Sequence, residues 1–176
     1  METVSNILDY TKQVPEKVKS GDFVYYIFPN PQKFLSNLVN QGYILHGTSR
    51  KIEGKLIPQR AYDEAKKFGN QKAIYLTSDS LVAIFTALTG GVNEIDARRN
   101  SIRSKRGKDG NYEYIETYFA VSNPVKVREK GYVYIFNNDV ADANENNEYI
   151  SRKPIKPIMI IQVERKNFPY KIEKIA

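Results

Sequence analysis

The sequence predicts a single α+β domain in which helices and strands alternate at first and strands dominate later. The chain has 176 residues, 41% of them hydrophobic and 27% charged, which suffices for one buried core and is short for two. Helical and strand-like periods alternate up to about residue 90, and β-branched, alternating segments prevail beyond it. No internal repeat and no glycine-rich dinucleotide or P-loop signature is present. These patterns favour α+β over a doubly wound parallel sheet.

The first 42 residues predict a short helix, a strand and a longer helix. Residues 3–19 contain a helical pattern broken by a proline, and residues 22–28 form a strand by their aromatic and β-branched content. Asn30 and Pro31 are a good N-cap and first-turn pair, and Gly42 stands where a helix-ending glycine belongs. The helix between them is therefore the clearest element of the chain.

The remaining 43–176 segment is expected to form the core of the domain. Its predicted elements are a strand at 43–45, a helix at 61–68, a strand at 73–76, a helix after Ser78 or Asp79, and strands at 112–121, 131–136 and 155–163. The helix after Asp79 carries an apolar face that includes Phe85. Polar residues 139–147 form a loop between the later strands.

The excess of positive charge is local. The chain has a net charge of +7, and residues 98–108 hold six basic residues and no acid, so the rest is close to neutral. We interpret this segment first as a solvated, flexible loop. The alternative is a patch that binds phosphate or an acidic partner, in which Arg98, Arg99, Arg103, Lys105 and Arg106 would contact nucleic acid.

The composition excludes several kinds of site. Without cysteine there are no disulfides, thiolate zinc sites or cysteine nucleophiles, and a single histidine rules out a multi-histidine metal cluster. A divalent ion held by carboxylates is the kind of metal site left open, and we assign no metal ligand. No run approaches the roughly 18 apolar residues of a membrane span, and the first residues lack the pattern of a signal peptide. We expect a cytoplasmic protein, or one delivered to a target cell without a conventional signal peptide.

Three short segments carry residues suited to chemistry. His46-Gly47-Thr48 follows an apolar strand, and the glycine would let a ligand approach the backbone. Tyr75 ends a strand before the helix of Phe85, so two rings could flank a flat heterocycle. Glu148 lies where a polar loop meets an apolar strand, a place suited to stabilising a cationic transition state. Taken singly, each has a structural explanation: a satisfied histidine, a packed tyrosine and a solvated glutamate.

In this order, the three segments resemble the motifs of the ADP-ribosyltransferase superfamily, in its His-Tyr-Glu branch with the poly(ADP-ribose) polymerases and diphtheria-type toxins. The resemblance covers about residues 43–163 and rests on His-Gly-Thr, an Ile-Tyr-Leu-Thr strand before a helix, and Asn-Glu-Tyr-Ile. It implies a split pair of antiparallel sheets with flanking helices around a cleft that binds NAD⁺.

The resemblance also implies roles for individual residues. His46 would bind a ribose hydroxyl, Gly47 the nicotinamide carboxamide, Tyr75 the nicotinamide ring, and Glu148 the 2′-hydroxyl of the nicotinamide ribose. Thr48, Ser78 and Phe85 would complete the site, with Ala83 standing where the polymerases have a serine. The other branch of the superfamily has Glu or Gln where this chain has Asn146, which disfavours arginine modification.

The predicted function is mono-ADP-ribosyl transfer, or hydrolysis of NAD⁺, with a protein or nucleic-acid acceptor. A bacterial toxin or defence effector would fit this activity, and a toxin could have a neutralising antitoxin as a further partner. The alternative is a basic nucleic-acid-binding module without catalysis, built on residues 98–108 with Tyr112 and Tyr114 as stacking residues.

Overall fold

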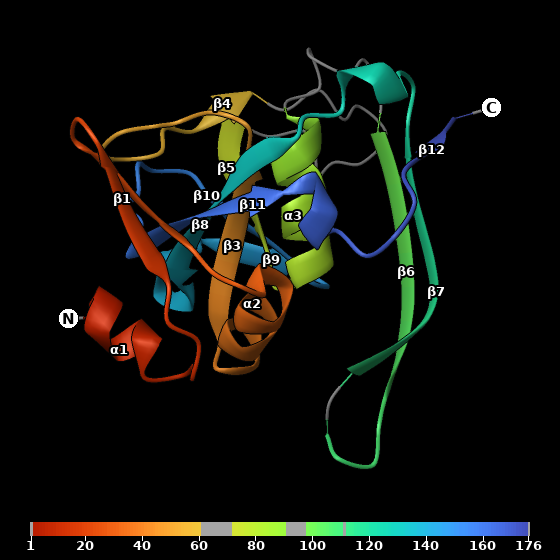
Figure 1. Cartoon of the computed structure of the whole chain (residues 1–176), viewed down its shortest axis with the longest axis horizontal. Coiled ribbons are helices and arrows are strands. Elements are labelled where there is room, and N and C mark those ends of the chain that lie inside the picture. Colours follow the sequence, from red (N-terminus) through yellow and green to blue (C-terminus); the bar gives the residue numbers. More distant parts are fainter. Residues whose placement is uncertain (1, 61–71, 91–97, 111, 176) are drawn as a thin grey trace.

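A computed structural model describes residues 2–60, 72–90, 98–110 and 112–175 of the chain (Figure 1). The α-helices in these residues are α1 (Val4–Leu8), α2 (Pro31–Asn40) and α3 (Ser80–Thr89), and single-turn 3₁₀ helices lie at η1 (Pro124–Lys126), η2 (Asn138–Val140) and η3 (Arg165–Asn167). Strands make up most of the regular structure, so the α+β class is confirmed. The helix expected at 61–68 lies outside the described residues.

The larger sheet contains nine strands among the described residues. They are β1 (Glu16–Ser20), β2 (Phe23–Ile27), β3 (Tyr43–Thr48), β4 (Gln59–Arg60), β5 (Lys72–Thr77), β8 (Lys130–Asn137), β9 (Ala143–Glu145), β10 (Glu148–Ser151) and β11 (Met159–Glu164). Their order is β1-β2-β11-β8-β3-β5-β10-β9, and β4 pairs with the first two residues of β5. The pairs are antiparallel except for β2 with β11, which is parallel.

A second sheet of three strands, in the order β12-β7-β6, stands beside the first. It consists of β6 (Arg98–Arg106), β7 (Tyr112–Val121) and β12 (Glu173–Lys174). Figure 1 shows β6 and β7 as a long hairpin that extends beyond the body of the molecule. Our interpretation of the basic segment as a flexible loop is therefore wrong, because β6 is held along its length by antiparallel pairing with β7.

The two longer helices begin at the caps that the sequence predicts. Oδ1 of Asn30 accepts the backbone N–H of Lys33 at 3.1 Å, and Pro31 occupies the first turn. Asp79, rather than Ser78, caps α3: its Oδ1 accepts the backbone N–H of Leu81 at 2.9 Å and that of the next residue at 3.1 Å. Each cap satisfies amides that have no partner within the helix.

Several strand boundaries differ from the prediction. Residues 16–20 form β1 rather than helix, because they pair with β2 as a hairpin closed by Gly21, whose φ of +60° suits glycine. The strand expected to end at Leu45 continues to Thr48, so His46 lies within β3 and not at its end. The last strand of the main sheet begins at Met159, four residues later than expected.

Helix α3 lies between the two sheets and forms the centre of the larger core. Toward the main sheet it crosses β3 and β8 so closely that a Cβ on Gly47 or Gly131 would fall 2.1–2.2 Å from a carbonyl oxygen of the helix. Toward the second sheet, the ring of Phe85 lies 5.1 Å from that of Phe119 on β7. A helix buried on both sides must be apolar nearly all round, as the sequence SLVAIFTALT is.

The opposite face of the main sheet carries a second, smaller core. Its fully or largely buried members come from β2, β3, β5, β8 and the loops after β3 and β10: Phe23, Ile44, Leu56, Ile74, Leu76, Tyr132, Tyr134, Phe136 and Ile155. Both faces of the central strands are therefore covered, which explains their nearly continuous apolar sequences.

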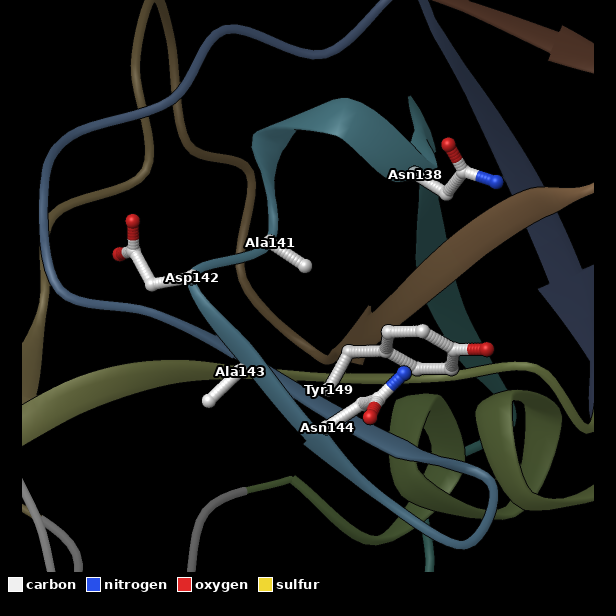
Figure 2. A pocket seen from close by; sticks show the side chains of 6 residues that line it. All are labelled: Asn138, Ala141, Asp142, Ala143, Asn144 and Tyr149. Atoms are coloured by element: carbon white, nitrogen blue, oxygen red, sulfur yellow. The ribbon is translucent and has the colours of Figure 1, made fainter.

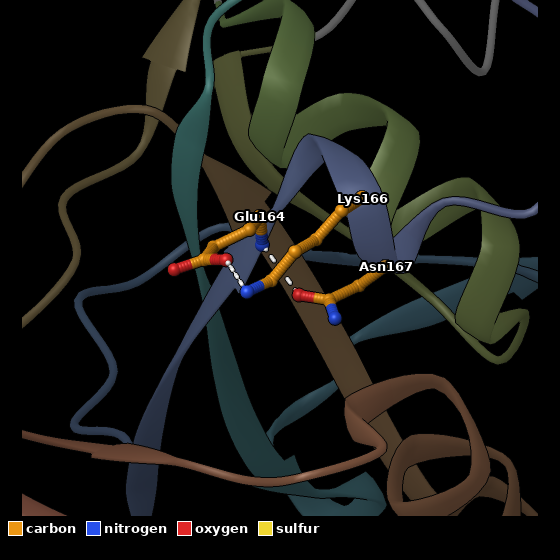
Figure 3. A network of polar contacts seen from close by, with 3 residues as sticks. All are labelled: Glu164, Lys166 and Asn167. Carbon is orange, nitrogen blue, oxygen red and sulfur yellow. Dashed lines mark hydrogen bonds and ion pairs between the residues drawn. The ribbon is translucent and has the colours of Figure 1, made fainter.

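The chain leaves the main sheet through a short polar network (Figure 3). The backbone N–H of Glu164 donates to Oδ1 of Asn167 at 2.8 Å, and the Glu164 carboxylate lies 2.9 Å from the ammonium of Lys166. These contacts close the turn of η3, which sends Phe168 into the core beside Phe119, at 4.8 Å between ring centroids.

Candidate functional site

The three strands that carry the predicted site motifs are neighbours in the main sheet. β3 holds His46, β5 holds Tyr75, and β10 begins at Glu148. β5 lies between the other two, with Glu148 paired to Thr77. Segments that are far apart in the sequence thus meet in one part of the sheet.

Backbone pairing between β3 and β5 stops beside His46. Leu45 is paired with Thr77, and within the described residues no further pair joins these six-residue strands. Instead, Nδ1 of His46 lies 2.7 Å from the carbonyl oxygen of Tyr75. A carbonyl can only accept, so Nδ1 carries the proton, and in the neutral ring Nε2 is an acceptor. The imidazole therefore bridges two strands at the point where the ladder is interrupted.

Side-chain alternation separates His46 from the other two motif residues. Successive residues of a strand point to opposite faces of the sheet. His46 follows Ile44 by two residues and shares its face, that of the smaller core. Tyr75 lies between two residues of that same core and so points to the opposite face, the one on which α3 packs. The ring of His46 reaches the strand of Tyr75, but the two side chains leave on different sides.

Glu148 lies on the same face as Tyr75. Directly paired residues share a face, and Glu148 is paired with Thr77, two residues beyond Tyr75 on β5. The carboxylate is exposed at the start of β10. Tyr75 and Glu148 therefore share one face of the sheet, whereas His46 lies on the other face, beside the interruption between β3 and β5.

A second glutamate, Glu145, lies directly opposite Glu148. β9 and β10 form a hairpin closed by Asn146 and Asn147, and Asn146 adopts φ of +55°, which asparagine tolerates well. Like charges placed opposite each other destabilise a hairpin, so this pair is a feature that stability alone does not favour. Our sequence reasoning missed Glu145, although the Glu-Asn-Asn-Glu spacing predicts a two-residue turn that makes the acids neighbours.

Ser78 connects β5 to this hairpin. Its backbone N–H donates to the carbonyl oxygen of Asn147 at 3.0 Å, and its hydroxyl donates to Oδ1 of the same residue at 3.2 Å.

The next residue, Asp79, is largely buried, and burial raises the pKa of its carboxyl although two amides donate to it. Burial and then the charge of Asp79 raise the pKa of Tyr114 to about 12.

The loop that follows His-Gly-Thr is fixed by a buried tyrosine. The hydroxyl of Tyr134 accepts the backbone N–H of Ile52 at 2.7 Å and donates to the carbonyl of Arg50 at 2.9 Å. Thr48 also holds the loop, since its Oγ1 accepts the N–H of Arg50 at 3.2 Å. The rings of Tyr134 and His46 meet edge to face at 6.3 Å, so one residue positions both the loop and the histidine.

An aromatic cluster lies next to this loop on the same face. The rings of Phe23, Tyr25 and Tyr132 contact one another at centroid distances of 5.3–5.6 Å. The ammonium of Lys51 lies 5.7 Å from the Tyr25 ring and 5.8 Å from the Tyr132 ring, within the range of a cation–π contact. This end of the sheet thus combines exposed positive charge with aromatic surface.

Burial keeps His46 neutral over a wide pH range. Removal from water is the largest cause that lowers its pKa below 6.5; the bond to the Tyr75 carbonyl acts in the opposite direction, and the charge of Arg98 lowers the pKa further. A neutral histidine whose Nε2 can accept a hydrogen bond but not donate one suits a sugar hydroxyl rather than a phosphate.

Two of the residues assigned to the site serve the core instead. Phe85 is fully buried between the rings of Phe119 and Phe168, so the assignment of Phe85 to a ligand pocket is corrected: the ring offers no surface to a ligand. Gly47 lies under α3, where a side chain would collide with the helix. The glycine is thus required by helix packing whatever its backbone binds.

The basic residues of the predicted nucleic-acid patch have different surroundings. The guanidinium of Arg98 donates to the Gly90 carbonyl and to Oγ1 of Thr89, at the C-terminus of α3, and burial lowers its pKa. The other four follow on the same strand. Arg99 is exposed, Arg103 pairs with Glu116 at 3.6 Å, Lys105 pairs with Glu113 at 3.5 Å, and Nε of Arg106 donates to the Gly110 carbonyl at 3.3 Å.

Glu148 does not line either of two hollows found on the described surface. One, of about 370 Å³, is lined by Asn138, Ala141, Asp142, Ala143, Asn144 and Tyr149, with the Tyr149 ring beside the Asn144 amide (Figure 2). Tyr149 packs against the smaller core, so this hollow opens on the face of His46. A smaller one, of about 190 Å³, lies between β2 and the segment Lys156–Ile160.

Within the described residues, no cluster of three or more potential metal ligands is found. None of their helices is both long and apolar enough to cross a membrane. Comparison of the chain with protein-family models, with curated proteins and with solved structures finds no match.

Proposed function

We propose that this protein cleaves the bond between nicotinamide and ribose in NAD⁺ and transfers ADP-ribose to a macromolecule or to water. One observation carries the proposal: the three motif strands are adjacent, with Glu148 and Tyr75 on one face and His46 in the interruption beside them. The split sheet that the resemblance implies would correspond to this interruption between β3 and β5.

The residues fit the two halves of the dinucleotide. Tyr75 would stack on the nicotinamide ring, Glu148 would accept the 2′-hydroxyl of the adjoining ribose, and Nε2 of His46 would accept a ribose hydroxyl of the adenosine half. Because His46 leaves the sheet on the other face, NAD⁺ would have to cross the interruption between β3 and β5. The cluster of Lys51 and Tyr25 would then lie on the adenosine side.

The chemistry needs one carboxylate. When the bond between C1′ and the nicotinamide nitrogen breaks, its electron pair leaves with the nicotinamide, which becomes neutral, and the ribose acquires oxocarbenium character. Glu148 would stabilise that positive charge. A hydroxyl of the acceptor, or water, then bonds to C1′ and releases its proton to solvent. The leaving group needs no general acid, since it departs from a cation.

The test is release of nicotinamide from NAD⁺ by the purified chain, with cell lysate as the source of acceptors. Replacing Glu148 by Gln should lower the rate by about 10²–10⁴-fold. Glu145→Gln is the matched control, because it removes the same like-charge contact from the hairpin and should leave cleavage within a few-fold of wild type. Wild-type release no greater than that of Glu148→Gln would refute the proposal.

The acceptor is a separate question with its own measurement. Nuclease treatment of the lysate should abolish labelling from radioactive NAD⁺ if the acceptor is nucleic acid, and leave it unchanged if the acceptor is protein. The alternative of a nucleic-acid-binding module is less well supported, because two of its five basic residues are paired with glutamates and a third caps α3.

A further inference from the structure

The outer strand of the second sheet is an edge. Among the described residues, β6 pairs with β7 on one side alone, over nine residues with one bulge after Arg103. Figure 1 shows this hairpin standing clear of the main sheet over much of its length. An edge of that length presents backbone N–H and C=O groups that another extended chain can bind.

The charges on this edge are all of one sign. β6 carries five basic residues among its nine and no acid, whereas β7 carries Glu113 and Glu116. On the outward face, Arg103 and Lys105 are each about two-thirds exposed and reach toward these glutamates. Arg99 lies on the same face, opposite the uncharged Ala120. On the β7 side, glutamates therefore face Arg103 and Lys105 but not Arg99, and among the described residues no strand faces any of the three on the other side.

The charges on β6 and β7 favour one kind of binding partner at this edge over two others. A second copy of the chain in antiparallel pairing around Ile102 would place Lys105 opposite Arg99, and like charges in that position repel. A nucleic acid would have to compete with Glu113 and Glu116 for the exposed cations, and the phosphate backbone would meet those carboxylates nearby. An extended chain with acidic residues on alternate positions would add one strand to the sheet, with Arg103 and Lys105 each between two acids and Arg99 facing one.

We propose that β6 binds an extended acidic segment of a partner polypeptide as an additional β-strand. Backbone hydrogen bonds would supply general affinity, and the outward row of Arg99, Arg103 and Lys105 would select acidic residues. This interaction does not depend on the proposed cleavage of NAD⁺.

The experiment compares the intact chain with a charge-swapped variant in which Arg103→Glu, Glu116→Arg, Lys105→Glu and Glu113→Lys are combined. The swap keeps both ion pairs of the hairpin and reverses the sign of the edge. The probe is a blocked, fluorescent heptapeptide of alternating Glu and Thr, with its Lys and Thr counterpart as control. Wild type should bind the acidic peptide, and the swapped variant should bind it roughly tenfold more weakly and prefer the basic one.

Two further measurements keep the proposal testable. Arg99→Glu alters no ion pair among those described and should weaken binding of the acidic peptide several-fold even if the swapped variant fails to fold. When the peptide is added, the backbone amide signals whose NMR chemical shifts change should be those of residues 98–106. Absence of peptide binding, equal binding by the swapped variant, or tighter binding of a single-stranded dodecanucleotide at the same residues would overturn the proposal, the last in favour of nucleic acid.

Discussion

His46 is the single histidine of the chain, and its burial makes stability depend on pH in a defined window. The unfolded chain takes up a proton near pH 6.5, whereas the folded chain does so at lower pH. Between these two pH values the unfolded state binds more protons, so the free energy of unfolding should fall as the pH is lowered through this window. Urea unfolding at several pH values should show this loss, and His46→Gln should reduce it.

Asp79 should make stability depend on pH in the opposite direction to His46, so it serves as a check on the assignment to His46. Its pKa is raised in the folded state, so the stability it contributes is present below its unfolded pKa and is lost as the pH rises through its folded value. Asp79→Asn should therefore change the slope at lower pH and leave the change near pH 6 intact. A His46→Gln variant with the wild-type slope near pH 6 would contradict the assignment.

Gly47 should not tolerate even one added methyl group. A Cβ would lie 2.1 Å from the Ala83 carbonyl oxygen and 2.8 Å from the Ala87 nitrogen, both of which are backbone atoms. Gly47→Ala should lower the free energy of unfolding by about 1–3 kcal/mol, measured by chemical denaturation. The reference is the wild-type chain. A Gly47→Ala variant as stable as wild type would show that α3 can move away from β3.

Some features of the candidate site residues could be predicted from the sequence and others could not. The three motif segments lie on neighbouring strands of the main sheet, an arrangement that their order along the chain does not by itself predict. The face on which His46 emerges could not be predicted, since it depends on pairing between β3 and β5. The roles of Gly47 and Phe85 could not be predicted either, because both are set by where α3 crosses the sheet.

At the scale of elements, Arg98 belongs to α3 although it lies on β6. Its guanidinium binds the carbonyl at the C-terminus of the helix, where a positive charge also meets the negative end of the helix dipole. Arg98→Ala should therefore cost about 1–2 kcal/mol of stability in chemical denaturation. Arg99→Ala, at an exposed position of the same strand, should cost less than about 0.5 kcal/mol. Similar effects of the two would argue against this cap.

The elements differed in how well local sequence predicted them. Helices α2 and α3 were identified by capping residues that act within a few positions, and β7 by alternating aromatic and β-branched residues. The strand β6 has little such pattern: it is polar and basic except for Ile102, and β7 holds it in place. Pairing with a distant segment overrode the loop-like composition, as it did for β1.

At the scale of the molecule, the far end of the hairpin should be separable from the rest. Ser104 pairs with Tyr114, so residues 105–113 can be replaced by Asn-Gly, which favours a tight hairpin turn. The described residues between them are mainly exposed, and we expect the melting temperature to change by no more than about 4 °C. Peptide binding at β6 should weaken while nicotinamide release stays unchanged. A variant that no longer folds would show that the whole hairpin belongs to the core.

The overall class was predictable and the arrangement was not. Composition and periodicity indicated an α+β domain with a strand-rich second half. The second sheet and the burial of α3 between two sheets depend on contacts such as that of Phe85 with Phe119, which no local pattern encodes. The interruption of the pairing between β3 and β5 likewise depends on contacts between distant segments, so the local sequence does not predict it.

The parallel contact between β2 and β11 constrains the order in which the domain can be completed. Tyr26 pairs with Ile161, so a strand from the first sixth of the chain occupies its position only beside one from the last tenth. During synthesis, the hairpin of β1 and β2 must wait until that late segment has left the ribosome, since β11 is its link to the other strands. In a nascent chain, the hairpin of β1 and β2 therefore lacks its partner strand until β11 has emerged.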